Sequence, residues 1–254
     1  MSKRAEAAVE GRVGHYAERI AIEGTDRYQI RLHLERYRFA ARYVDDQVVL
    51  DVACGEGYGS DILHRAGALR TVGLDISQAA VAHATDRYGK PQLVFMHGDA
   101  QKLPFSPRSF GAVVSFETVE HVPDYLSYLR EVRRVLSPGG VYLVSTPNRL
   151  RESPGCGPND PVPNPHHVRE FTREELLPIL GSMFKIEGLY GQGLLHPLWT
   201  PVRLIEGSRA VRRALHRIKL SRYPIGHIGT RGVRPWSGRY RDPAFFIVVC
   251  RAPD

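Results

Sequence analysis

The chain has few cysteines and no long apolar run. Its 254 residues include only three cysteines, which stand far apart at Cys54, Cys156 and Cys250. An odd count at this spacing predicts neither a disulfide framework nor a Cys-x-x-Cys metal site. No stretch approaches the roughly 20 consecutive apolar residues of a membrane helix, and residues 1–12 lack the apolar segment of a secretory signal. We therefore expect a reduced, cytoplasmic protein, and the sequence assigns no residue to a metal site.

Acidic residues are nearly absent from one segment. Arginine and lysine occupy eleven positions between residues 200 and 241, and Glu206 is the only acid there, so this segment carries +10. Because the whole chain carries +8, the remainder carries −2. The sequence thus describes a nearly neutral body with one strongly basic segment.

Short apolar runs alternate with amphipathic stretches along the first 150 residues. The runs that predict strands are 48–50, 71–74, 93–96, 112–116 and 141–144. The stretches that predict helices are 29–44, 60–65, 79–88 and 124–136. Strands that alternate with helices form right-handed βαβ units, so we expect an α/β fold with a parallel sheet.

Residues 51–59, DVACGEGYG, follow the first predicted strand and put three glycines where a ligand can approach the backbone. A dinucleotide site is one interpretation, since Asp75, about 20 residues on, could accept ribose hydroxyls. However, the glycines are spaced GxGxG and not GxGxxG, and Asp51 and Glu56 would repel a pyrophosphate. A ligand with a nucleoside at one end and positive charge at the other fits both observations. S-adenosylmethionine is such a ligand.

Acidic residues end three successive predicted strands, at Asp51, Asp75 and Asp99. Asp51 in the glycine loop suits the ammonium and sulfonium of S-adenosylmethionine, and Asp75 suits its ribose. Asp99 can accept from the adenine amine, while Ile76 and Ala100 would cover the adenine ring. We therefore predict S-adenosylmethionine as the cofactor.

Four segments resemble motifs of class I S-adenosylmethionine-dependent methyltransferases. They are VVLDVACGEGYG, VGLDIS, GDAQKLPFSPRSFGAVVSFETVEHV and REVRRVLSPGGVYLVSTPN, within residues 47–148. The resemblance implies a Rossmann-like, seven-stranded, mostly parallel sheet with helices on both faces and an antiparallel last strand. The last two strands would be 184–190 and 245–250. We expect a methyltransferase domain over 47–254, preceded by an N-terminal helical cap over 1–46.

The resemblance also implies which residues contact the cofactor. They are Arg36, Asp51, Ala53, Gly55, Gly57, Asp75, Ile76, Asp99, Ala100, Gln101, Phe116 and His121. Arg36 would bind the methionine carboxylate, although a solvated arginine on an amphipathic helix explains this residue equally well. Phe116 would reach the cofactor from the end of the fourth strand, with His121 just beyond it.

A hydroxyl acceptor must lose its proton, whereas a neutral amine offers a free lone pair, so a base matters only for transfer to oxygen. The candidates are Glu117, His121, His166 and His167. His167 is the first choice because it lies in the long connection 147–171 and because imidazole titrates near neutral pH.

Two further features of this region predict helix ends. Glu120 is expected to begin the helix after the fourth strand, where its charge would interact with the N-terminal amides. Thr172, followed three residues later by Glu175, predicts a capping box and the start of another helix.

The basic segment lies within 194–242, between the last two predicted strands. Its apolar residues at 202, 205, 210, 211, 215 and 218 could form a basic amphipathic helix. Three roles are open for it. It could bind an anionic acceptor, contact RNA or an anionic membrane surface, or serve as a solvated cap or subunit contact.

The sequence therefore predicts a methyltransferase that acts on an oxygen or nitrogen of a small molecule. NPHHVREFTREEL, over 164–176, resembles a segment of bacterial members that often modify sugars, so a sugar, sugar nucleotide or natural product is expected. An RNA methyltransferase that uses 200–241 is one alternative, although FETV follows the fourth strand where such enzymes carry an Asn-Pro-Pro-Tyr type motif. A non-catalytic S-adenosylmethionine-binding protein is the other.

Overall fold

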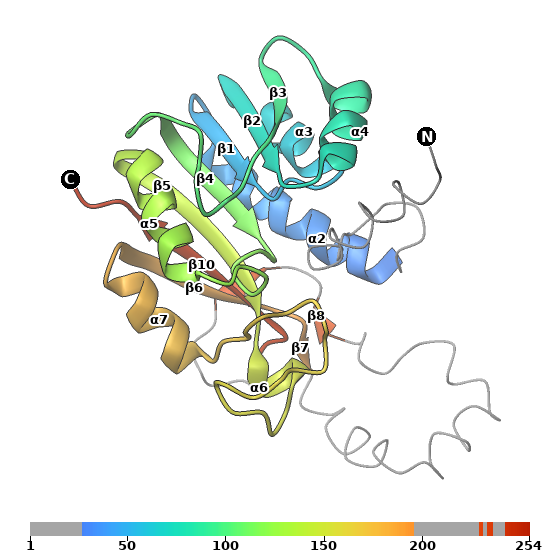
Figure 1. Cartoon of the computed structure of the whole chain (residues 1–254), viewed down its shortest axis with the longest axis vertical. Helices are drawn as coiled ribbons and strands as arrows, with labels where there is room; N and C mark the ends of the chain where they lie inside the picture. The colour runs from blue at the N-terminus through green and yellow to red at the C-terminus, as the bar shows by residue number, and fades with distance from the viewer. Residues whose placement is uncertain (1–26, 196–228, 231–232, 236–241) are drawn as a thin grey trace, which may run out of the picture.

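A single large sheet forms the centre of the computed structural model, which describes residues 27–195, 229–230, 233–235 and 242–254 (Figure 1). The strand order is β3-β2-β1-β4-β5-β10-β6-β9. The strands are β1 (Val48–Val52), β2 (Arg70–Asp75), β3 (Leu93–His97), β4 (Phe110–Phe116), β5 (Leu136–Pro147), β6 (Lys185–Gln192), β9 (Arg234–Pro235) and β10 (Phe245–Arg251).

The first five strands pair in parallel, and β10 lies antiparallel between β5 and β6. This confirms the predicted seven-stranded, mostly parallel sheet with an antiparallel last strand. The two-residue β9 adds an eighth strand at the edge, where it pairs with Tyr190 and Gly191 of β6.

Helices cover both faces of the sheet, as expected. They are α2 (Arg27–Ala40), α3 (Tyr58–Arg65), α4 (Gln78–Tyr88), α5 (Tyr125–Val135), α6 (Arg149–Glu152) and α7 (Arg173–Gly181), with a 3-10 turn at Ala41–Tyr43. Side chains alternate between the two faces of each strand. Val113 of β4 therefore packs into a core with Leu129 of α5 and Leu176 of α7. Its neighbour Val114 packs into a second core with Tyr37 of α2 and Leu63 of α3.

Glu120 does not begin α5, so the expectation for this residue is wrong. Asp124 is the N-cap instead, and its side chain accepts from the Ser127 amide at 2.9 Å. The Glu120 carbonyl accepts from the amides of Val168 and Arg169. These long-range bonds hold Glu120 against the 147–171 connection, and its side chain is fully buried. The capping box of Thr172 and Glu175, by contrast, is confirmed at the start of α7.

Only the ends of the 194–242 segment belong to the described residues. There β7 (Leu194–Leu195) pairs antiparallel with β8 (Gly229–Thr230). The predicted basic amphipathic helix lies outside the described residues, as do residues 1–26 of the predicted cap, and the division into a cap and a domain stays a prediction. Within the described ranges, no helix is long and apolar enough to span a bilayer.

Gly57, the residue before α3, has φ +83, and a Cβ atom there would lie 2.6 Å from Ala84 Cβ and 2.9 Å from the Phe95 ring. We expect Gly57→Ala to lower the free energy of unfolding by about 2–4 kcal/mol, since left-handed strain and overpacking add. Urea denaturation measures this. Gly55→Ala is the matched control, because φ is +54 but, apart from its two chain neighbours, no described residue has an atom within 4 Å of the added Cβ. Its expected cost is about 1–2 kcal/mol. Equal losses would contradict the role of the clash.

Candidate functional site

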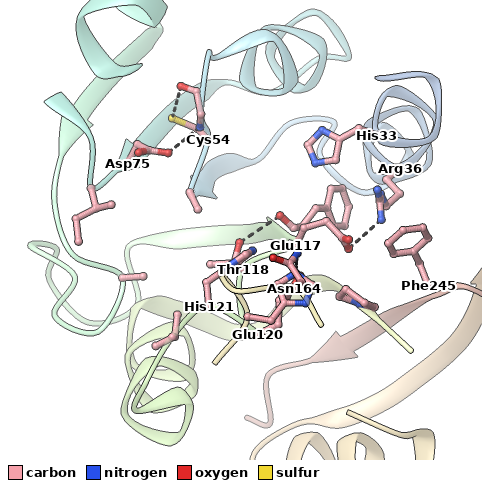
Figure 2. A pocket seen from close by; sticks show the side chains of 18 of the residues that line it. His33, Arg36, Cys54, Asp75, Glu117, Thr118, Glu120, His121, Asn164 and Phe245 are labelled. Carbon is pink, nitrogen blue, oxygen red and sulfur yellow. Dashed lines mark hydrogen bonds and ion pairs between the residues drawn. The ribbon is translucent and has the colours of Figure 1, made fainter. Parts of the chain in front are cut away.

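A cavity of about 590 Å³ opens beyond the carboxyl ends of β1, β2 and β4 (Figure 2). Ligands bind at this edge in open α/β sheets because the connecting loops converge there. Ten of the twelve residues predicted to contact the cofactor line this cavity. They are Arg36, Ala53, Gly55, Asp75, Ile76, Asp99, Ala100, Gln101, Phe116 and His121. The other two, Asp51 and Gly57, lie beside it without lining it.

Asp75 is held rigidly at one end of the cavity. Its Oδ2 accepts from the Gly55 amide at 2.8 Å, and its Oδ1 accepts from the Ser77 amide at 2.9 Å. A carboxylate has about four lone-pair positions, so each oxygen can accept one more bond from a ligand in the cavity. The space around Gly55 is open, since nothing lies within 4 Å of an added Cβ. This arrangement fits the predicted ribose contact.

Arg36 lies at the opposite end and is only 1% exposed, which excludes the solvated arginine considered from the sequence. Its Nη1 is 2.9 Å from Glu117 Oε1, and its guanidinium lies over the Phe245 ring at 4.6 Å (Figure 2). Its buried Nε has no hydrogen-bond partner among the described residues. A buried donor of this kind costs free energy unless a ligand satisfies it. The methionine carboxylate of the predicted cofactor fits this position.

Glu117 contacts both Arg36 of α2 and Ser145 of β5. It has φ +53, a conformation that L side chains rarely adopt. Its amide donates to the Ser145 carbonyl at 3.1 Å, and its Oε1 accepts from Ser145 Oγ at 2.7 Å. These contacts with β5 hold the strained backbone in place. The carboxylate of Glu117 thereby stays next to Arg36.

Asp51 is buried beneath the glycine loop. Its carboxylate accepts from Tyr37 Oη at 3.0 Å and from Ser60 Oγ at 2.6 Å. Burial raises the pKa of Asp51 to about 7, although both of these hydrogen bonds lower it, and the charge of Asp75 raises it further. Asp51 therefore links β1 to α2 and α3 and supports the loop from below.

The raised pKa of Asp51 has a consequence for stability. Its value of about 7 in the folded state lies above the ordinary 3.8. The contribution of this group to stability is therefore full below pH 4 and is lost as the pH rises through 7. Asp51→Asn removes this dependence, so the difference in unfolding free energy, wild type minus variant, should fall by a few kcal/mol between about pH 4 and pH 7.5. Urea titrations across this range measure it, and parallel curves would contradict the assignment.

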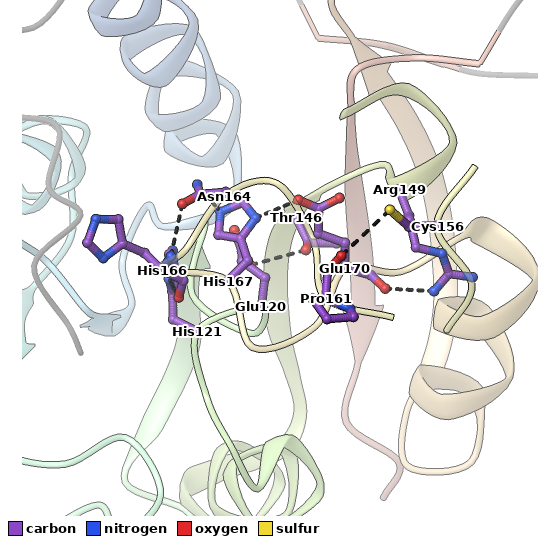
Figure 3. Close-up of polar contacts among 10 residues, drawn as sticks. All are labelled: Glu120, His121, Thr146, Arg149, Cys156, Pro161, Asn164, His166, His167 and Glu170. Atoms are coloured by element: carbon purple, nitrogen blue, oxygen red, sulfur yellow. Dashed lines mark hydrogen bonds and ion pairs between the residues drawn. The ribbon is translucent and has the colours of Figure 1, made fainter. Parts of the chain in front are cut away.

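His167 is oriented on both sides of its ring. Its Nδ1 is 2.7 Å from Glu170 Oε1, and both side chains are nearly inaccessible (Figure 3). Asn164 Oδ1 accepts from the His166 amide at 3.0 Å, so the Asn164 amide group presents Nδ2–H to His167 Nε2, 3.0 Å away. His167 is therefore the neutral tautomer with its proton on Nδ1, which donates to Glu170. A carboxylate that orients a histidine in this way is the arrangement found around catalytic bases.

His121 lies edge-on against His167, with ring centroids 4.9 Å apart. Its Nδ1 donates to the His166 carbonyl at 2.9 Å, so Nε2 is its acceptor nitrogen. Of the four candidate bases, His166 alone does not line the cavity, and it contributes its backbone to both neighbours.

Glu120 completes this group from below. Its Oε2 accepts from Thr146 Oγ1 at 3.1 Å, while its Oε1 has no partner among the described residues (Figure 3). Burial raises the pKa of Glu120 well above its ordinary value, and the charge of Glu117 raises it further. Glu120, His121 and His167 bring one nitrogen or oxygen each to within 4.8 Å of one another.

Sequence reasoning missed several residues of the cavity, notably His33, Asn164, Glu170 and Phe245. Asn164, His167 and Glu170 are spaced three residues apart inside a long connection, and this regular polar spacing was an available signal. Phe245 had no such signal, because only the antiparallel pairing of β10 with β5 brings it to Arg36.

Comparisons with known proteins agree with this geometry. A family model described as a methyltransferase domain matches residues 50–144. A probable S-adenosylmethionine-dependent methyltransferase of Mycolicibacterium smegmatis is 40% identical over 167 residues, which are 65% of this chain and 63% of the relative. The chain is thus similar to S-adenosylmethionine-dependent methyltransferases over about two thirds of its length, and residues 50–144 match the methyltransferase domain. A phthiotriol/phenolphthiotriol dimycocerosates methyltransferase of Mycobacterium tuberculosis is 38% identical over 115 residues, which are 44% of this chain and 43% of that one.

The chain spans less than two thirds of the length of these curated relatives. Solved structures share its fold. The [4+2]-cyclase SpnF superposes with a TM-score of 0.61 at 21% identity, over 94% of this chain and 87% of that one. An S-adenosylmethionine-dependent methyltransferase from Mesorhizobium loti has a TM-score of 0.57 at 21% identity, over 87% of this chain and 99% of that one. The similarity to these proteins indicates S-adenosylmethionine as the cofactor, and Asp75, Gly55 and Arg36 fit it.

Proposed function

We propose that this chain transfers the methyl group of S-adenosylmethionine to a hydroxyl oxygen of a small molecule, such as a sugar, a sugar nucleotide or another natural product. The observation that supports it is the His167–Glu170 pair, an oriented imidazole that lines the same cavity as the cofactor residues. A neutral amine needs no base, whereas a hydroxyl does. An oriented base therefore favours oxygen over nitrogen.

S-adenosylmethionine supplies an activated methyl group on its sulfonium. The chain has to hold the acceptor in line with that group and to exclude water. Arg36 and Asp75 would fix the two ends of the cofactor. His167 would take the hydroxyl proton at Nε2 when the acceptor displaces the Asn164 N–H, and the negative charge of Glu170 would stabilise the imidazolium that results. His121 would bind the acceptor beside His167.

Methyl transfer with a labelled cofactor tests this proposal. The purified full chain is incubated with a small-molecule extract and S-adenosylmethionine labelled with ¹³C in its methyl group, and the products are analysed by NMR. O-methyl and N-methyl carbons resonate in different ranges, so the spectrum identifies the acceptor atom. We expect labelled O-methyl products with the wild-type chain. The control is Asp75→Ala, assayed at a concentration of S-adenosylmethionine too low for the variant to bind it, and it should give no labelled product. Labelled N-methyl products alone would contradict the proposal.

The RNA alternative depends on residues 200–241, most of which lie outside the described residues. Filter binding of the wild-type protein at two salt concentrations separates it from the small-molecule proposal, because contacts with phosphates weaken steeply as salt rises. No retention of RNA at low salt would exclude the RNA alternative. Salt-sensitive retention would favour it, and Arg212, Arg213 and Arg217 would be the first residues to neutralise.

A further inference from the structure

The acceptor end of the cavity is rich in carboxylates. Glu117, Glu120, Glu152 and Glu170 line it, and among the described lining residues Arg36 is the single arginine or lysine. Arg36 pairs with Glu117 at 2.9 Å and is assigned above to the methionine carboxylate, so it does not serve a second anion. A phosphate or carboxylate group placed beside Glu120 and Glu170 would meet further negative charge in a largely buried site. The part of the cavity that the structure describes therefore disfavours an anionic group next to the reacting atom.

Two buried carboxylate oxygens in this region have no donor among the described residues. Glu120 is fully buried and Glu170 is 2% exposed. One oxygen of each accepts a bond, from Thr146 Oγ1 and from His167 Nδ1 respectively. The other oxygens, Glu120 Oε1 and Glu170 Oε2, have no partner in the part of the chain that the structure describes. Buried acceptors of this kind require donors from elsewhere.

We infer that the acceptor end recognises an uncharged group with hydroxyls on neighbouring carbon atoms, one methylated at His167 and the other bound by Glu120 or Glu170. This deepens the proposed function and rests on it. A hydroxyl donates only one hydrogen, whereas the site offers two carboxylate oxygens and an imidazole nitrogen. More than one hydroxyl is thus needed. Because Glu120, His121 and His167 each bring one nitrogen or oxygen to within 4.8 Å of the others, these hydroxyls must be close together.

A metal ion or an ammonium group fits the same carboxylates less well. The Asn164 Nδ2–H points at His167 Nε2, and a cation at that nitrogen would meet the positive end of this N–H bond. A hydroxyl can donate to one partner and accept from another, so it matches the mixture of Asn164 donor and glutamate acceptors. Burial also raises the pKa of Glu120, and a hydroxyl fits the carboxylate by donating or the carboxylic acid by accepting.

The test uses the full chain saturated with S-adenosylhomocysteine and a panel of methyl glycosides of common hexoses and pentoses. Each is matched with its monodeoxy, phosphorylated and amino counterparts, and binding is measured by ligand-observed NMR. We expect at least one neutral glycoside with adjacent hydroxyls to bind. Its phosphate and its amine should bind at least about 10-fold more weakly, as should the derivative that lacks either of the two hydroxyls, because the site's polar groups are then unpaired. Failure of every neutral glycoside to bind would overturn the inference.

Two variants test whether Glu120 or Glu170 binds the second hydroxyl of the glycoside. At least one of Glu120→Gln and Glu170→Gln should weaken binding of the glycoside at least about 10-fold. The affinity for S-adenosylhomocysteine should stay at the wild-type value in both variants, which also shows that they fold. Glu187→Gln is the control, because Glu187 pairs with Arg251 on the surface and should change neither affinity. Wild-type affinity in both cavity variants would overturn the inference. So would preferred binding of a phosphate, or binding that EDTA abolishes.

The inference and the proposed function can fail separately. If the labelled-methyl experiment yields an O-methyl product from a compound without an adjacent hydroxyl, the inference fails and the proposed function stands. If that experiment yields only N-methyl products, the proposed function fails.

Discussion

Replacing His167 with alanine is expected to lower kcat by about 10²–10⁴, the usual contribution of a positioned general base. Affinity for S-adenosylhomocysteine should stay near the wild-type value, because the residues proposed to hold the two ends of the cofactor, Asp75 and Arg36, make no hydrogen bond or ion pair with His167 in the described part of the chain. The measurement is steady-state kinetics on the acceptor found by methyl labelling, together with calorimetry for the cofactor. Raising the pH should restore part of the rate, because hydroxide can take the proton that the imidazole no longer accepts.

His166→Ala is the matched control. The side chain of His166 does not line the cavity, and only the backbone of His166 bonds to His121 and Asn164. Its kcat should therefore stay close to wild type. The kcat of Glu170→Gln should lie between those of His167→Ala and His166→Ala, since glutamine keeps the shape of glutamate but not the charge that stabilises the imidazolium. An unchanged kcat in His167→Ala would remove this residue from the chemistry.

Replacing Asp75 with alanine is expected to weaken S-adenosylmethionine binding by about 2–4 kcal/mol, a loss of roughly 30-fold to 1,000-fold. Two ribose hydroxyls would lose charged acceptors worth about 1.5–3 kcal/mol each, with incomplete additivity. The Gly55 and Ser77 amides would lose their acceptor as well, so the glycine loop would also be less ordered. Isothermal calorimetry with S-adenosylhomocysteine measures the change.

Asp99→Ala provides the comparison for Asp75→Ala. Asp99 is exposed, and its Oδ1 accepts from the Gln101 amide at 2.8 Å, so we expect a smaller loss of affinity, below about 1.5 kcal/mol. Circular dichroism would establish that both variants fold. Tight binding of NADH by the wild-type protein, with no response to S-adenosylhomocysteine, would contradict the assignment of the cofactor.

The sheet and the cofactor end of the site could be predicted from the sequence because both depend on local patterns. Apolar runs, helix periodicity and the glycine loop each lie within a few residues, and parallel strands bring their carboxyl ends to one edge. Asp75 and Asp99 could therefore be assigned to one ligand site from the sequence alone.

The acceptor end could not be predicted in the same way, because it depends on contacts between distant segments. Glu120 is turned inward by backbone bonds to Val168 and Arg169. The burial of Arg36 at the cofactor end could not be predicted for the same reason, because it depends on the pairing of β10 with β5, which brings Phe245 against Arg36. Burial at these positions is a property of the assembled sheet, and no short pattern in the sequence encodes it.

The connection that carries Asn164, His167 and Glu170 begins and ends at the same point of the molecule. Asn148 and Phe171 form a parallel bridge, the Arg149 amide donates to the Phe171 carbonyl at 3.0 Å, and Asn148 Nδ2 donates to the Pro243 carbonyl at 2.9 Å. Its two ends are thus clamped to each other and to the sheet. Doubling the length of a flexible loop with fixed ends costs only about 0.6 kcal/mol. A connection of different length or composition could therefore be grafted between these anchors while Gly55, Asp75 and Arg36 keep the contacts described above, so new acceptors could be reached by exchanging a single loop.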